Sequence, residues 1–169
     1  EKQLQVAKDS IFQQTGKEIA IFPCDVSNEE DCKDFIEGVI KLFGRIDILV
    51  NNAGTAAAFS FEQVGTELWR SDLDLKLFST INCAKYAVQE MKKQKSGAII
   101  NVTAVLAKTP PANSLPTTVS RAAGIALTKA MSNDLGPAGI RVNTECIGLI
   151  RSDQIEKRWK TQEPSLSWE

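Results

Sequence analysis

The chain has 169 residues, a formal net charge of −1 at pH 7 and an ordinary apolar content. This length suits one domain over residues 1–169, and the charge gives no electrostatic reason to expect nucleic acid or an acidic membrane as a partner. No window of about 18 uncharged apolar residues is present, which excludes a membrane span, and the charged start is unlike a secretory signal. We therefore expect a soluble, cytoplasmic protein.

Four short apolar runs rich in Val and Ile alternate with longer helical patterns along the chain. Near-continuous apolar runs of this kind predict strands that are buried on both faces of a parallel sheet. The predicted strands cover residues 18–26, 46–54, 97–105 and 140–148.

Helical patterns fill the intervals between these strands. The first begins at Ser27 and Glu30, which form a capping-box pair, and ends at Gly44, which supplies a left-handed stop. A second helical region runs from about residue 66 to residue 93, and a third begins near Pro116 and ends near residues 136–137. This order predicts an α/β fold of three layers around a doubly wound parallel sheet. The charged end, 151–169, predicts a surface helix or flap.

The sequence contains no histidine and a single tyrosine, Tyr86. Within this chain, Ser-His-Asp or Cys-His hydrolysis and zinc held by histidine are therefore excluded. The cysteines Cys24, Cys32, Cys83 and Cys146 show no CxxC pattern, which favours small buried hydrophobes over disulfides or a metal site. Acid–base chemistry near neutral pH then needs a carboxylate, a lysine, a cysteine, water or the ligands themselves.

Three stretches of the sequence resemble the short-chain dehydrogenase/reductase family. They are DILVNNAG, GAIINVTAV and SRAAGIALTKAMSNDLGPAGIRVN, and the resemblance covers nearly the whole chain. It implies a Rossmann-like fold, NAD or NADP as cofactor, and oxidation or reduction of a small alcohol or carbonyl substrate. It also implies a homodimer or homotetramer formed through the long helices at about 66–93 and 116–135.

The resemblance also suggests which residues contact the dinucleotide. Gly54 ends the NNAG motif and allows a ligand to approach the backbone closely at the end of a strand. Asp25 would contact the adenine ring, although it could simply form an Asx turn before the next helix, and both roles can coexist. The implied cofactor-binding residues are Asp25, Val26, Asn52, Ala53, Gly54, Arg121 and Gly148.

The family's phosphate-binding glycine motif, TGxxxGxG, has no counterpart in this sequence. Residues 1–16 resemble the helix that follows the family's second strand. We therefore expect an opening βαβ unit of about 30 residues to lie outside this sequence. The strand predicted at 18–26 would then lack a neighbour for its backbone hydrogen bonds.

The resemblance places different residues at the family's catalytic positions. The family uses a tyrosine with a lysine four residues later, together with a serine and an asparagine. Aligning TTVSRAAG places Thr117 at the tyrosine and Arg121 at the lysine. The serine position falls on Ala104 or, after a slip of one residue, on Thr103, and the asparagine position falls on Lys76.

These replacements predict altered chemistry. Thr117 is a poor proton donor because the pKa of its hydroxyl lies far above the roughly 10 of tyrosine, and it could simply begin the helix. Arg121 stays cationic and can bind ribose hydroxyls. Lys76, if buried against Arg121, would have a lowered pKa and could act as acid or base; otherwise it reaches solvent or pairs with Asp72 or Asp74.

Three functions are consistent with this pattern. The first is an NAD(P)-dependent oxidoreductase whose proton comes from Lys76, water or the substrate. The second is a catalytically silent relative that binds a dinucleotide. The third is a scaffold subunit that pairs with an active homologue.

Overall fold

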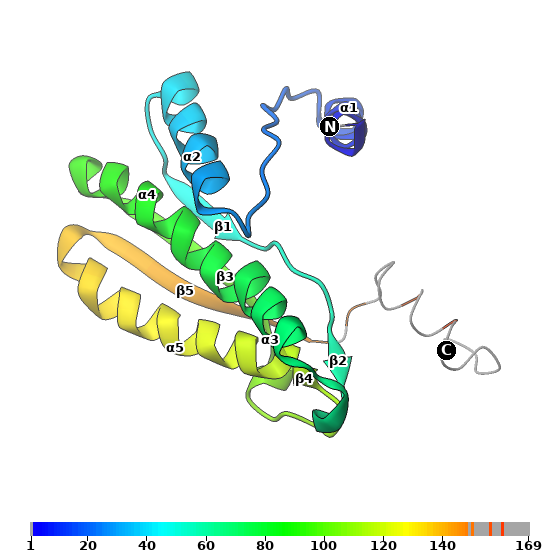
Figure 1. Cartoon of the computed structure of the whole chain (residues 1–169). Coiled ribbons are helices and arrows are strands. Elements are labelled where there is room, and N and C mark those ends of the chain that lie inside the picture. Colours follow the sequence, from blue (N-terminus) through cyan, green and yellow to red (C-terminus); the bar gives the residue numbers. More distant parts are fainter. Residues whose placement is uncertain (1, 149, 151–155, 157–159, 161–169) are drawn as a thin grey trace.

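A computed structural model describes residues 2–148, 150, 156 and 160 of the chain. Three parallel strands form a sheet in the order β1-β3-β5, and helices α4 and α5 lie across one face of it with α2 beside α4 (Figure 1). The elements of this unit are β1 (Ile48–Asn51), β3 (Gly97–Ala104), β5 (Ile140–Ile147), α2 (Glu29–Phe43), α4 (Ser79–Gln94) and α5 (Thr117–Leu135). A separate antiparallel pair joins β2 (Ala58–Phe59) to β4 (Leu115–Pro116).

The buried core lies between the sheet and these helices. Side chains alternate along β5, where Ile140 and Val142 are buried whereas Arg141 and Asn143 are exposed. Fully buried apolar side chains come from both the helices and the sheet, and the largest are Ile36, Met91, Ile99 and Ile140. The predicted alternation of strands and helices is thus confirmed for the part of the chain that carries the site.

The second predicted helical region is present but is not one continuous α-helix. Helix α3 (Thr66–Leu73) runs into a π-helical turn (Asp74–Phe78), which leads into α4. Such turns hold an extra residue and are frequent at functional sites. The third predicted helix is confirmed as α5, which a 3-10 turn (Gly136–Ala138) follows.

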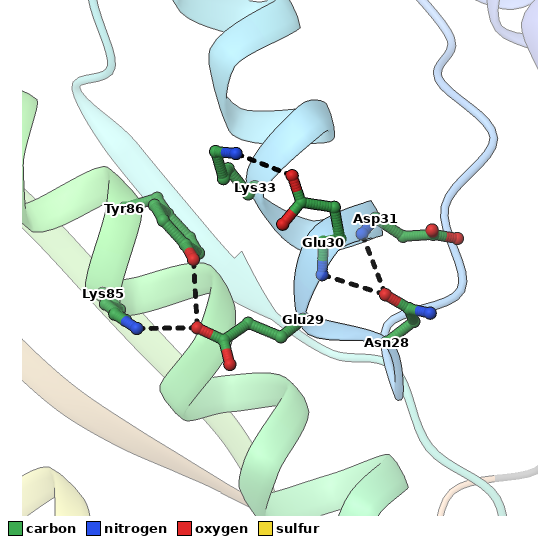
Figure 2. A network of polar contacts seen from close by, with 7 residues as sticks. All are labelled: Asn28, Glu29, Glu30, Asp31, Lys33, Lys85 and Tyr86. Atoms are coloured by element: carbon green, nitrogen blue, oxygen red, sulfur yellow. Dashed lines mark hydrogen bonds and ion pairs between the residues drawn. The ribbon is translucent and has the colours of Figure 1, made fainter.

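The cap of helix α2 is Asn28, one residue later than the predicted cap at Ser27. The side chain of Asn28 accepts hydrogen bonds from the backbone amides two and three residues later, at 2.9 and 3.2 Å (Figure 2). The prediction of a capping pair between Ser27 and Glu30 is therefore wrong, because the Ser27 hydroxyl donates to Asp25 instead, at 2.7 Å. The predicted stop is confirmed, since Gly44 ends α2 with a φ of 74°.

The strand predicted at 18–26 does not form in this structure. Residues 18–25 make no ladder with another strand, because β1 is the edge of the sheet among the described residues. The segment packs on α2 instead, with the rings of Phe22 and Phe35 separated by 5.8 Å between centroids. The prediction of burial on both faces is also wrong, because residues 18–26 are half-buried or exposed and none is buried. A strand buried on both faces needs a neighbour for its backbone hydrogen bonds.

Helix α1 (Lys2–Thr15) stands apart from the sheet in Figure 1 and contains no buried residue. The flap expected at 151–169 lies outside the described residues, except for Glu156 and Lys160. No helix in the described part of the chain is long and apolar enough to cross a membrane.

Candidate active site

The candidate site is a recess at the carboxyl ends of β1 and β3. Asn51, the last residue of β1, lies opposite Asn101 in the register of the sheet, and Thr103 lies two residues further along β3. The recess has a volume of about 20 Å³ and is lined by residues of these strands, the loop after β1, the π-helical turn, α4 and α5. Open α/β sheets bind their ligands at this edge.

A larger hollow of about 440 Å³ lies between α2 and α4. Its charged lining residues balance in sign, and none of the buried polar residues lies in that lining. The small recess instead collects five buried polar residues, namely Lys76, Thr80, Asn101, Thr103 and Ser120. Burying polar groups costs free energy, so a cluster of them indicates a structural or catalytic role. We therefore take the recess as the candidate site.

A chain of polar side chains fixes the strand ends that form the recess. The side-chain amide nitrogen of Asn51 donates to the side-chain oxygen of Asn101 at 2.8 Å. The side-chain amide nitrogen of Asn101 donates to the hydroxyl of Thr128 in α5, also at 2.8 Å. The Thr128 hydroxyl in turn donates to the carbonyl of Gly124 at 2.8 Å. These bonds connect β1, β3 and α5, so the residues after Asn51 leave the sheet in a defined position.

Lys76, which lines the recess, belongs to a buried ion pair. The Lys76 ammonium donates to Asp72, and the side chains of Lys76 and Asp72 are only 4% and 2% exposed. Ser120 of α5 donates to the other carboxylate oxygen of Asp72 at 2.6 Å. Of the alternatives for Lys76, the pairing with Asp72 is the one that the structure contains, and Lys76 does not reach solvent.

Lys76 and Arg121 place two cations beside one carboxylate. Burial lowers the pKa of the Lys76 ammonium, Asp72 opposes this effect, and Arg121 lowers the pKa further. Burial also lowers the pKa of the Arg121 guanidinium, again opposed by Asp72, but an arginine keeps its charge at physiological pH. Lys76 thus gives up a proton more readily than an exposed lysine.

Arg121 faces the recess with its hydrogen-bond donors unused. Its backbone carbonyl accepts a bond from the Thr103 hydroxyl at 3.2 Å, whereas its guanidinium donates to no residue in the described part of the chain. A side-chain carbon built at Gly54 would lie 3.9 Å from the guanidinium and 3.6 Å from Lys76. The backbone of the NNAG motif therefore passes beside the aliphatic part of Lys76 and the guanidinium of Arg121.

The recess brings together four of the residues predicted from the sequence. Ala53, Lys76, Thr103 and Arg121 all line it. Ala104, the other choice for the serine position, does not. Because the Thr103 hydroxyl already donates its proton to the protein, Thr103 can only accept a hydrogen bond from a ligand.

Neither Thr117 nor the single tyrosine, Tyr86, lines this recess. Thr117 is absent from its lining; its amide donates to the carbonyl of Ala57 at 3.2 Å, and its buried hydroxyl has no partner among the described residues. Tyr86 points the other way, with its hydroxyl donating to Glu29 of α2 at 3.0 Å (Figure 2). Lys76 is therefore the lining residue best suited to release a proton.

The other predicted cofactor residues lie outside the recess. Asp25 and Val26 precede α2, where the Asp25 carboxylate accepts the amide and the hydroxyl of Ser27 at 3.0 and 2.7 Å, which is the Asx turn given as an alternative. Asn52 and Gly148 are exposed, and a side-chain carbon at Gly148 would meet nothing within 4 Å. These positions remain open to a ligand.

Sequence reasoning missed several residues of the site. Asp72 was considered only as a partner of Lys76, and Ser120, Asn51, Asn101 and Thr80 were not singled out. Ser120 directly precedes Arg121 and Asn51 opens the NNAG motif, so adjacency to a predicted residue was the available signal.

Together, the parallel sheet and a recess at its carboxyl edge define a Rossmann-like α/β protein. The family model described as short chain dehydrogenase matches residues 1–163. The chain belongs to the short-chain dehydrogenase family.

Similar proteins confirm the predicted fold class. The chain is 34% identical over 145 residues to human dehydrogenase/reductase SDR family member 4, covering 85% of this chain and 52% of that protein. It is 33% identical over 141 residues to a 3-oxoacyl-[acyl-carrier-protein] reductase of Synechocystis, covering 83% of this chain and 57% of that one. The chain thus spans about half the length of these curated relatives.

Two solved structures show the same doubly wound three-layer fold. NAD⁺-bound xylitol dehydrogenase superimposes with a TM-score of 0.87 at 28% identity, covering 93% of this chain and 60% of that one. ElxO with NADP bound superimposes with a TM-score of 0.85 at 27% identity, covering 95% of this chain and 66% of that one.

Proposed function

We propose that the protein is an NAD(P)-dependent oxidoreductase that acts on a small carbonyl or alcohol and uses Lys76 as its proton donor. The observation that carries this proposal is the buried Lys76, with a lowered pKa, in a recess at the strand ends beside the guanidinium of Arg121, which donates to none of the described residues. A catalytic acid works best when its pKa lies near the working pH, and burial moves a lysine in that direction.

The residues around the recess fit a dinucleotide. Gly54 brings the backbone close to Lys76 and Arg121, and the unused donors of Arg121 suit ribose hydroxyls. Ala53 and Gly54 would pass beside the cofactor, Gly148 leaves open space, and Asp25, Val26 and Asn52 would contact its more distant parts. The bound cofactor would supply or accept the hydride. One relative holds NAD⁺ and another NADP, so either cofactor is consistent with the family.

Each lining residue then has a role that its contacts permit. The Lys76 ammonium has three protons and shares one with Asp72, which leaves others for a substrate oxygen. Arg121 stabilises the negative charge that develops on that oxygen. Thr103 accepts a hydrogen bond from a substrate hydroxyl, whereas Thr117, the first residue of α5, lies outside the recess and takes no part in proton transfer.

A second candidate is a catalytically silent relative that binds a dinucleotide. It is favoured by the exclusion of Thr117 from the recess and by the pairing of Lys76 with Asp72. In that case Lys76, held by Asp72, would bind the ligand and would not transfer a proton.

We also propose that α4 and α5 form the interface of a homodimer or homotetramer, which sedimentation of the full-length protein would measure.

The free thiols of the described residues favour a reducing compartment, and we place the protein in the cytoplasm.

Calorimetric titration of the full-length protein with NAD(H) and NADP(H) tests the cofactor. A screen of carbonyl compounds that follows nicotinamide absorbance then tests turnover, with Lys76→Met as the variant and Lys108→Met, at an exposed position, as its control. We expect binding, turnover, and loss of turnover only in Lys76→Met. Binding without turnover would favour the silent relative, and no binding would overturn both candidates.

A further inference from the structure

We propose that Asp72 is a positioning residue that works with Ser120 to hold Lys76 in its protonated form and direct it toward the recess. The proposal rests on the proposed function, because it assigns the group that prepares Lys76 for proton donation. Asp72 does not line the recess itself and acts through Lys76.

The contacts of Asp72 fix its carboxylate from two elements. One oxygen accepts from Lys76 in the π-helical turn, and the other accepts from Ser120 of α5 at 2.6 Å. With its side chain only 2% exposed, Asp72 is shielded from bulk solvent. The carboxylate therefore cannot rotate away from Lys76 unless it also loses Ser120, which immediately precedes Arg121.

The charges around Lys76 explain why a carboxylate is needed there. The charged groups that act on its ammonium, within the described residues, are Asp72 from α3 and Arg121 from α5. Burial and Arg121 both favour the neutral amine, and Asp72 alone favours the charged form. Without Asp72, Lys76 would lose its proton at a lower pH and could no longer donate one during carbonyl reduction.

The chain contains a matched control two residues away. Asp74 begins the π-helical turn and is exposed, so it carries the same charge without the contact to Lys76. If charge near the recess were all that mattered, Asp72→Asn and Asp74→Asn would have similar effects.

The test measures kcat and KM against pH for the full-length protein and the variants Asp72→Asn, Asp74→Asn and Ser120→Ala. We expect Asp72→Asn to lower kcat about a hundredfold at neutral pH with little change in KM, since general acids contribute about a hundredfold or more. The pH at which kcat falls on the alkaline side should also move down. Ser120→Ala should shift in the same direction by less, and Asp74→Asn should match the wild type.

A second readout does not depend on activity. Carbon NMR of protein labelled at the lysine Cε atoms gives the pKa of Lys76, assigned with Lys76→Met, and this pKa should be lower in Asp72→Asn than in the wild type. If Asp72→Asn does not fold, Ser120→Ala carries both measurements.

The outcomes separate this inference from the proposed function. An active wild type whose Asp72→Asn variant keeps the alkaline limb and the Lys76 pKa overturns the role of Asp72 and leaves the function standing. A wild type that binds dinucleotide without turnover overturns the function, and the Lys76 pKa in Asp72→Asn then supports or overturns the control by Asp72.

Discussion

Removing one member of the buried pair should cost more stability than removing both. Lys76→Met keeps the length of the side chain but removes the ammonium that donates to the buried Asp72 carboxylate. With exposures of 4% and 2%, the pair lies far from the surface limit, in which an ion pair contributes about 0–1 kcal/mol. We therefore expect Lys76→Met to lower the free energy of unfolding by about 3–5 kcal/mol.

The double replacement Lys76→Met with Asp72→Leu should recover most of this loss. Apolar side chains of similar size often replace a buried ion pair without cost, or with a gain of about 1–4 kcal/mol. The hydrogen bond from Ser120 is lost, which offsets about 1 kcal/mol of that recovery. The double variant should therefore unfold within about 1 kcal/mol of the wild type, or be more stable, while lacking turnover.

Thermal unfolding of the full-length protein, followed by circular dichroism, measures the difference. At about 2–4 °C per kcal/mol for a domain of this size, Lys76→Met should melt about 6–20 °C below the wild type. Asp74→Asn serves as the control and should stay within about 0.5 kcal/mol. A melting temperature of Lys76→Met equal to that of the wild type would contradict this prediction. So would a double variant that is less stable than each of the two single variants.

Other variants test individual contacts elsewhere in the fold. Gly139 and Gly44 have φ angles of 76° and 74°, but only at Gly139 would an added side-chain carbon approach a backbone oxygen, that of Lys95, at 2.5 Å. Replacement by Ala should thus lower the free energy of unfolding by about 1–2 kcal/mol at Gly44 and by clearly more at Gly139. Urea titration measures both losses, and equal losses would contradict the contact with Lys95. Asn101→Leu leaves the side-chain amide of Asn51 in β1 without its acceptor and should cost about 1–3 kcal/mol, whereas a loss below about 1 kcal/mol would show that water replaces it. Burial raises the pKa of the Cys32 thiol from 9.0 to about 12, so its contribution to stability is present below pH 9 and is lost as the pH rises toward 12. Cys32→Ala should flatten the fall in stability above pH 9, and an unchanged slope would contradict the assignment.

The sequence was most informative about structure that depends on local contacts. The helix that ends at Gly44 was predicted because a left-handed stop is encoded by one residue. Its start was placed one residue early because Ser27 and Asn28 are both good caps, and the choice depends on Asp25, which takes the Ser27 hydroxyl. The strand at 18–26 failed for the opposite reason, since its pairing depends on a neighbour that the pattern cannot supply.

The same limit applies to the candidate site. The NNAG motif and the replaced catalytic positions led to Ala53, Lys76, Thr103 and Arg121, which do meet. The bonds that hold them in place connect residues far apart in the chain. Ser120 and Asp72 are 48 residues apart, and Asn51 and Asn101 are 50 apart. No spacing rule indicates such partners, because they are brought together only by the packing of α3 on α5 and of β1 on β3.

The most direct test of the account is chemical rescue of Lys76→Ala in the full-length protein. This variant leaves a space beside Asp72 that a small primary ammonium ion can enter. If Lys76 donates the proton, methylammonium or ethylammonium should restore turnover in proportion to its concentration, whereas tetramethylammonium, which has no N–H group, should not. A folded Lys76→Ala variant that binds the dinucleotide and turns over at the wild-type rate without added amine would contradict the account.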